Sequence, residues 1–130
     1  MKVIFTNGCF DILHRGHLEL LKFCRSIGDH VVVGINSDDS VRKIKGPDRP
    51  IFSQEDRKAI LESLTCVDEV FVFHEKTPQS LINSINPDII VKGSDYSPDK
   101  VIGNESCEVV IFELLDGYST TKTIQDITNR

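Results

Sequence analysis

"MKVIFTNGCFDILHRGHLELLKFCRSIGDHVVVGIN", residues 1–36, contains the pattern that decides the fold. Lys2–Thr6 is rich in β-branched and aromatic residues, which favours a strand. From about Gly16 the apolar side chains recur at helical spacing, and Gly28 follows the last of them as a stop signal. His30–Asn36 is apolar throughout its centre, as in a strand buried on both faces. This stretch therefore predicts a strand, a helix and a second, buried strand.

The same alternation continues along the chain. A short helix is expected over "SDDSVRKI", a loop over "KGPDRP", and a helix from Ser53, whose first turn is acidic. Five further segments follow: the strands "VDEVFVF", "DIIVKG" and "EVVIFEL", and the helices "TPQSLINSI" and "STTKTIQDI". Residues 1–130 are therefore expected to form one doubly wound α/β domain, with a five-stranded parallel sheet and helices on both faces.

Composition narrows the class of protein. The 15 Lys and Arg residues are outnumbered by 20 Asp and Glu residues, giving a net charge of −5. That balance argues against a nucleic-acid or membrane-surface partner, since either would need a basic face. No secretion signal or run of transmembrane length is recognisable, and no CxxC spacing occurs among Cys9, Cys24, Cys66 and Cys107. Free thiols and a cytoplasmic location are expected.

Ligands of doubly wound folds bind beyond the carboxyl ends of the strands, and unusual residues fall there. His14, Gly16 and His17 follow the first strand and open a helix. A glycine permits close backbone approach, and a helix start attracts anions. Two imidazoles at that place are able to donate hydrogen bonds to a phosphate. Two alternatives stay open: the histidines are ordinary loop residues, or they bind a metal together with Cys9.

The cationic segment Arg42–Arg49 and the single residue Arg57 are further candidates for binding an anion. Arg42–Arg49 contains four cations and one anion beside glycine and proline, so it is either a mobile loop that closes over a polyphosphate or a solvated face. Arg57 lies on the inward side of its helix, three and four residues before Ile60 and Leu61. A cation there needs a bound anion or a buried aspartate.

A motif in "GCFDILHRGH", residues 8–17, resembles the signature of the HxGH nucleotidylyltransferases, a cytidylyltransferase-like family. The resemblance continues through "GINSDDSVRKIKGPDRPI", "EDRKAILESL", "PDIIVKGSDY" and "DGYSTT". The chain is most similar to the group that adenylates heptose 1-phosphate for lipopolysaccharide core precursors. The glycerol-3-phosphate cytidylyltransferases are the next most similar group, although Leu115 and Asp116 depart from their last motif.

The resemblance implies a Rossmann-like fold and transfer of a nucleoside monophosphate from a nucleoside triphosphate, ATP in preference to CTP, to a phosphorylated sugar. Pyrophosphate would leave, and Mg²⁺ would accompany the triphosphate. The implied catalytic residues are His14, His17, Lys43, Lys45 and Arg57. The implied nucleotide-binding residues are Gly8, Phe10, Gly16, His17, Lys92, Gly93, Asp95, Ser119, Thr120 and Thr121. Candidates for contact with the acceptor are Asp11, Asp38 and Arg57.

Two other functions remain alternatives to this one. The first is a cytidylyltransferase that uses CTP and glycerol 3-phosphate or another polyol phosphate. The second is a regulatory module that binds nucleotide without turnover, although such a module would not need a full set of groups for the transition state. The resemblance also implies a homodimer. In the heptose pathway a separate chain would supply the sugar kinase.

Overall fold

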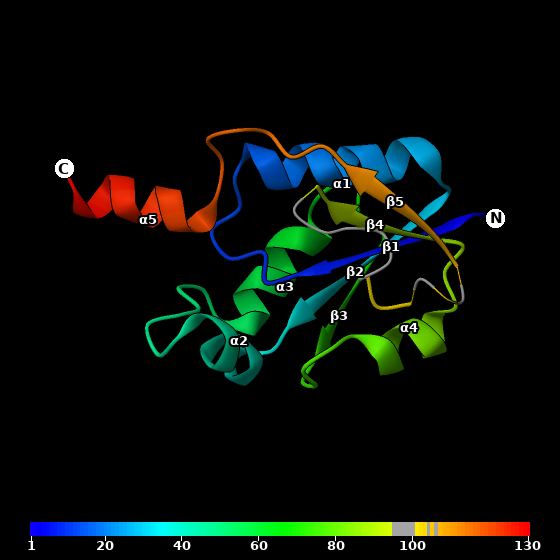
Figure 1. Cartoon of the computed structure of the whole chain (residues 1–130), viewed down its shortest axis with the longest axis horizontal. Helices are drawn as coiled ribbons and strands as arrows, with labels where there is room; N and C mark the ends of the chain where they lie inside the picture. The colour runs from blue at the N-terminus through cyan, green and yellow to red at the C-terminus, as the bar shows by residue number, and fades with distance from the viewer. Residues whose placement is uncertain (95–100, 104, 106) are drawn as a thin grey trace.

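The computed structural model describes residues 1–94, 101–103, 105 and 107–130. Its helices and strands follow one another along the chain as β1 (Val3–Gly8), α1 (Arg15–Ile27), β2 (His30–Asn36), α2 (Asp38–Lys45), α3 (Gln54–Glu62), β3 (Glu69–Phe73), α4 (Gln79–Ile85), β4 (Ile89–Gly93), β5 (Glu108–Phe112) and α5 (Thr120–Thr128). The strands form one parallel sheet in the order β3-β2-β1-β4-β5 (Figure 1). The predicted doubly wound α/β fold is confirmed.

The strand order places a crevice beside β1. The chain runs outward from β1 to β2 and β3, and then returns to place β4 on the other side of β1. In such sheets the ligand lies where the direction of winding reverses, outside the carboxyl ends of the strands. Those ends are reached here at Gly8, Asn36, Phe73, Gly93 and Phe112.

Apolar helix faces cover both sides of the sheet (Figure 1). Leu21 and Cys24 of α1 and Leu61 of α3 pack on one side, in a cluster that includes Ile4 and Val33. On the opposite side, Ile82 of α4 packs with Phe5, Val32 and Ile90, and Leu81 and Ile85 join them. Both faces of the central strands are therefore closed to water, which explains their continuous apolar sequence.

Gly28 ends α1 as predicted, but the reason is close packing, because its φ of −154° is extended. A Cβ at this position would lie 2.2 Å from Ile4 Cγ1. Only glycine leaves room for the strand side chain beneath the end of the helix.

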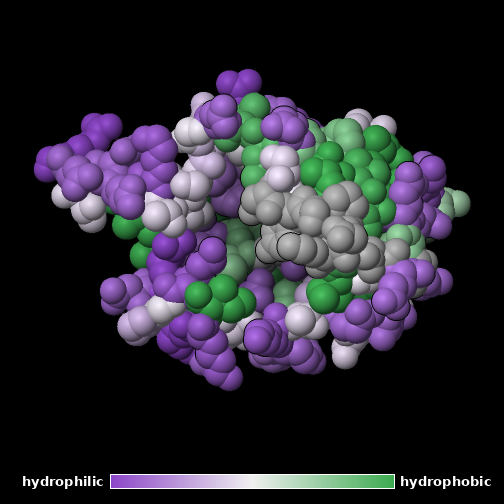
Figure 2. All heavy atoms as spheres, in the orientation of Figure 1, coloured by the Kyte–Doolittle hydropathy of each residue, from purple (hydrophilic) through white to green (hydrophobic). Residues whose placement is uncertain are grey.

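The last helix, α5, stands apart from the body of the domain. It forms over nearly the predicted range, yet none of its residues is buried. It extends away from the sheet in Figure 1, and Figure 2 shows hydrophilic residues over most of its visible face. Its first residue is held by a hydrogen bond of 2.5 Å, which the Thr120 hydroxyl donates to the carbonyl of Asp11. In the described part of the chain no helix is long and apolar enough to cross a membrane.

Candidate active site

A cavity of about 550 Å³ lies at the carboxyl ends of the strands. That volume suits a small ligand of nucleotide size. Segments that follow all five strands contribute to its wall, so residues far apart in sequence share one space. The expected site residues that line it are Gly8, Phe10, Asp11, His14, Gly16, His17, Lys45, Lys92, Gly93, Ser119, Thr120 and Thr121.

His14 and His17 form a stacked pair at the start of α1. His14 is the residue that precedes the first turn, and the ring centroids lie 3.8 Å apart with 22° between the planes. The backbone N–H of His14 donates to Nδ1 of His17 over 3.2 Å. Nδ1 of His17 is therefore the acceptor nitrogen, and in the neutral ring the proton resides on Nε2. His17 thus carries an N–H donor that the protein itself orients.

The surroundings of both rings favour the neutral form. Burial, together with the charge of His14, lowers the pKa of His17 from 6.5 to about 4, although Asp11 opposes the shift. Burial also lowers the pKa of His14. Two stacked imidazoles cannot easily share two positive charges. Near pH 7 the pair can therefore offer neutral donors to charge that develops on a bound phosphate.

This arrangement predicts the titration of His17. Its NMR signals should titrate with a midpoint near pH 4, because protonation would cost the buried ring its solvation without a compensating partner. Unfolded chains would take up that proton first as the pH falls below 6.5, so this residue should lower stability between pH 6.5 and 4. His17→Gln identifies the signals, and a midpoint near 6.5 would contradict the geometry.

Gly16 gives the His14 ring its place. A Cβ on this residue would lie 2.9 Å from Cε1 of His14 and 3.2 Å from Cβ of Tyr118. The glycine was expected to admit a ligand, and it also admits a ring of the protein and the segment before α5. The helix start, the histidine pair and the segment before α5 are thus held close together.

The hydroxyls at the start of α5 have separate tasks. Ser119 caps the helix, because its Oγ accepts from the backbone N–H of Lys122 over 3.0 Å. Thr120 reaches Asp11, as described above, and Thr121 lines the cavity. On the neighbouring strand, Nζ of Lys92 donates to the carbonyl of Asn7 over 2.9 Å. Asp95, another expected contact, lies outside the described residues.

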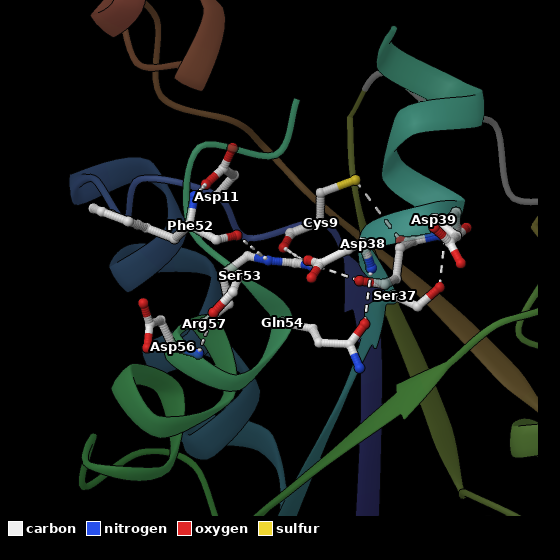
Figure 3. A network of polar contacts seen from close by, with 12 residues as sticks. Cys9, Asp11, Ser37, Asp38, Asp39, Phe52, Ser53, Gln54, Asp56 and Arg57 are labelled. Atoms are coloured by element: carbon white, nitrogen blue, oxygen red, sulfur yellow. Dashed lines mark hydrogen bonds and ion pairs between the residues drawn. The ribbon is translucent and has the colours of Figure 1, made fainter. Parts of the chain in front are cut away.

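Arg57 does not line the cavity, and its side chain is fully buried. Its Nε donates to Phe52 O, one terminal nitrogen donates to Cys9 O and Asn36 O, and the other donates to Asp38 Oδ1 (Figure 3). These distances lie between 2.8 and 3.0 Å. In this structure the guanidinium joins segments of the protein, the alternative that the sequence left open, and its role on a phosphate stays a prediction. Asp38, which also lies outside the cavity wall, is the charge partner of Arg57, and its contact with the acceptor likewise stays a prediction.

Asp11 lines the cavity, but its carboxylate is largely committed to the loop before α3. Oδ2 accepts from the N–H of Ile51 over 2.7 Å, and Oδ1 accepts from that of Phe52 over 2.9 Å. The side chain is only 2% exposed, so these bonds replace its water. Its position suits the anchoring of the loop better than the binding of an acceptor hydroxyl.

The cationic segment is only partly a loop. Residues up to Lys45 belong to the last turn of α2, and the loop begins at Gly46, whose φ is +106°. Lys45 lines the cavity, whereas Lys43 is exposed outside its wall. The structure also adds wall residues that the sequence did not single out: Asn7, Asn36, Phe73, Lys76, Thr77 and Tyr118. Their only signal was position, at or shortly after the end of a strand or before α5. Arg49, from the cationic segment Arg42–Arg49, lines the cavity as well.

The metal hypothesis receives no support from the described ranges. Within residues 1–94, 101–103, 105 and 107–130, no three His, Cys, Asp or Glu side chains come together in a way that could hold a metal ion. Cys9 instead contacts Asn36, with 3.8 Å between Sγ and Oδ1, and burial raises the pKa of its thiol.

This fold, with a cavity at the carboxyl ends of its strands, is that of the doubly wound α/β class, whose ligands bind at that edge of the sheet. The family model described as cytidylyltransferase-like matches residues 5–126, and the chain belongs to that family. The family recognised from the HxGH motif is thus confirmed, and with it the enzyme class of the nucleotidylyltransferases.

Curated relatives extend over almost the whole chain. It is 49% identical over 133 residues to the bifunctional protein HldE of Syntrophotalea carbinolica, covering 98% of this chain and 27% of that protein. It is 50% identical over 127 residues to the bifunctional protein HldE of Helicobacter pylori, covering 97% of this chain and 28% of that protein. The chain thus spans about a quarter of the length of these relatives.

Solved structures agree with the fold. The crystal structure of the lipopolysaccharide core biosynthesis protein from Thermoplasma volcanium superimposes with a TM-score of 0.76 at 30% identity, covering 89% of this chain and 99% of that one. A bifunctional NMN adenylyltransferase/ADP ribose pyrophosphatase from Francisella tularensis gives a TM-score of 0.70 at 20% identity, covering 98% of this chain and 42% of that one. The second likeness concerns the fold alone.

Proposed function

We propose that residues 1–130 form a nucleotidylyltransferase domain that transfers AMP from ATP to a sugar phosphate such as heptose 1-phosphate and releases pyrophosphate. The observation that carries the proposal is the oriented Nε2–H of His17 at the start of α1, inside a cavity whose wall also holds Lys45, Arg49 and Lys92. The "VKGSDY" and "DGYSTT" segments and the similarity to HldE proteins favour the adenylated heptose phosphate.

In the proposed reaction, an oxygen of the acceptor phosphate attacks the α-phosphorus of ATP. The bond to the new oxygen forms as the bond to the pyrophosphate oxygen breaks, so the protein need not form a covalent intermediate. Negative charge spreads over the α-phosphate oxygens in the transition state. We expect the N–H of His17 and the positive end of α1 to stabilise that charge, because both are already oriented by the protein at the start of α1.

By strand order, the residues of the cavity wall fall into two halves, one for each substrate. Lys92 and Gly93 lie at the end of β4, the hydroxyls at the start of α5 follow β5, and we place the nucleotide there. Lys45, Arg49 and Lys76 lie beyond β2 and β3, and we place the acceptor there. The histidine pair follows β1, which lies between the two halves. Such positioning lets two bound substrates meet as if they were one molecule.

Magnesium is proposed to arrive with the triphosphate. The described residues provide no cluster of carboxylates for a divalent ion, and Asp11 already accepts two backbone N–H groups. Oxygens of the triphosphate and water would therefore supply its ligands, as is usual for this ion. Bound there, magnesium would neutralise charge on the leaving pyrophosphate.

A substrate matrix tests the proposal. The four nucleoside triphosphates are each combined with heptose 1-phosphate, a hexose 1-phosphate, glycerol 3-phosphate and choline phosphate, and released pyrophosphate is measured. We expect the highest kcat/KM for ATP with heptose 1-phosphate, because specificity depends on contacts that strengthen in the transition state. Omission of the acceptor is the control for simple hydrolysis.

Two outcomes would replace the proposal. Turnover of CTP with glycerol 3-phosphate would keep the enzyme class but assign the protein to the cytidylyltransferases that act on polyol phosphates. Nucleotide binding without pyrophosphate from any pair would favour the regulatory module. A homodimer, a cytoplasmic location and a separate sugar kinase chain stay predictions, which sedimentation, fractionation and a kinase assay would test.

A further inference from the structure

Arg49 is a half-buried arginine whose side chain makes no hydrogen bond within the described residues. It lines the cavity with 17% of its side chain exposed, and its Nε is buried without a hydrogen-bond partner. Its charged neighbour is Asp11, with 3.8 Å between Nε and Oδ2. Arg57, by contrast, has four hydrogen bonds to the protein. A partly buried guanidinium whose donors have no hydrogen-bond partner in the described protein is costly, so this one is suited to a ligand.

Asp11 positions Arg49 without occupying its donors. Both carboxylate oxygens accept N–H groups from the loop that continues from Arg49, at Ile51 and Phe52. The 3.8 Å separation is too long for a hydrogen bond but short enough for attraction between charges. The carboxylate therefore holds the loop and balances part of the charge, and the donors of Arg49 stay available.

The surroundings of Arg49 favour an anion. Lys45 and Lys76 line the same half of the cavity, beyond β2 and β3. Among the described wall residues, Asp11 is the only carboxylate. Three cations against one carboxylate give this half a positive potential. A planar guanidinium can also grip two phosphate oxygens at once, which the ammonium group of a lysine cannot do.

We propose that Arg49 binds the phosphate of the acceptor and selects phosphorylated acceptors, with Asp11 as its positioning residue. The proposal rests on the proposed function for the identity of the acceptor, and on the cavity wall for the anion site. Lys45 and Lys76 attract the acceptor into the same half. Arg49 is thus a specificity-determining residue distinct from the histidine pair.

Steady-state kinetics of Arg49→Gln and Arg49→Lys test the role. Arg49→Gln should raise the KM for heptose 1-phosphate by about 10–100-fold, the usual effect of losing a charged pair of hydrogen bonds, and change the KM for ATP less than about threefold. The KM of Arg49→Lys for heptose 1-phosphate should lie between those of wild type and Arg49→Gln. Lysine keeps the positive charge but lacks the paired N–H donors of the guanidinium. Lys22→Gln, an exposed cation on α1 outside the cavity wall, is the matched control for net charge. Equal effects on both KM values, or an effect confined to ATP, would overturn the proposal.

A binding experiment separates this proposal from the proposed function. Inorganic phosphate is titrated into wild type, Arg49→Gln and Lys22→Gln without nucleotide, and binding is followed by calorimetry. Arg49→Gln should weaken phosphate binding at least about tenfold, whereas Lys22→Gln should match wild type. Equal phosphate affinity in Arg49→Gln and wild type would overturn the assignment of Arg49 even if the enzyme turns over. Loss of phosphate binding in Arg49→Gln would support it even if the substrate matrix fails.

Discussion

Arg57→Ala is expected to lower the free energy of unfolding by about 3–5 kcal/mol, the usual cost of removing one partner of a buried ion pair. The guanidinium joins the end of β1, the end of β2, the start of α2 and the residue before Ser53, the cap of α3 (Figure 3). Without it, the buried carbonyl of Asn36 and the partly buried carbonyls of Cys9 and Phe52 lose their donor, and Asp38 loses its charge partner. Urea unfolding of the protein without nucleotide measures the change.

Three further variants make this stability test specific. Arg57→Lys keeps the charge, but a single ammonium group cannot reach four separate acceptors, so it should also be strongly destabilising. Asp38→Asn should cost less, because that side chain is 28% exposed and loses one contact. Arg42→Ala is the matched control, since this arginine is exposed and pairs with the exposed Asp39, and it should cost less than about 1 kcal/mol. An Arg57→Ala protein of normal stability with a raised KM for substrate would favour the phosphate-binding role expected from the sequence.

The arginines show where sequence stops predicting this site. A cation on the inward face of a helix fits a bound anion and a buried partner equally well. The choice depends on whether carbonyls from other segments reach it, and Cys9 lies 48 residues from Arg57. Arg49 presents the opposite case: within a charged segment it looked like any other cation, and Asp11 fixes its loop from 40 residues away at Ile51. Such contacts follow from tertiary packing, which no local pattern encodes.

The framework of the site was predictable for a physical reason. Apolar strands alternate with amphipathic helices, and in parallel sheets this alternation forces the carboxyl ends of the strands to one edge. His14, Lys92 and Thr121 could therefore be placed together from their positions after or near strands. Lys76 also follows a strand, but an exposed lysine in a loop has no distinguishing pattern. The position of a residue relative to the strands predicted that it lies at the carboxyl edge of the sheet. Only the structure showed which of these side chains line the cavity.

Removal of the Nε2–H of His17 is expected to lower kcat by about 10²–10³-fold with little change in the KM for ATP, because the donor acts on charge that develops in the transition state. Substitution of His17 by asparagine or by glutamine distinguishes the roles of the two ring nitrogens. His17→Asn places an oxygen near the position of Nδ1, so it can still accept from the backbone of His14 while it lacks the distal donor. His17→Gln carries an amide N–H near the position of Nε2 and loses the acceptor at Nδ1.

The two variants should therefore diverge in catalysis. His17→Asn is expected to behave like His17→Ala in kcat, and His17→Gln should retain turnover within about tenfold of wild type, because one donor is replaced by another. Initial rates of pyrophosphate release at saturating substrates measure kcat, and thermal unfolding of each variant verifies that the fold is intact. If His17→Asn turns over normally and His17→Gln fails, the ring serves the start of α1 through Nδ1, and the charge at the α-phosphorus is stabilised by other groups. A loss of kcat in His17→Asn and His17→Ala but not in His17→Gln would identify the neutral His17 N–H as the group that acts on the transition state. The ring is neutral because it is buried and stacked against His14.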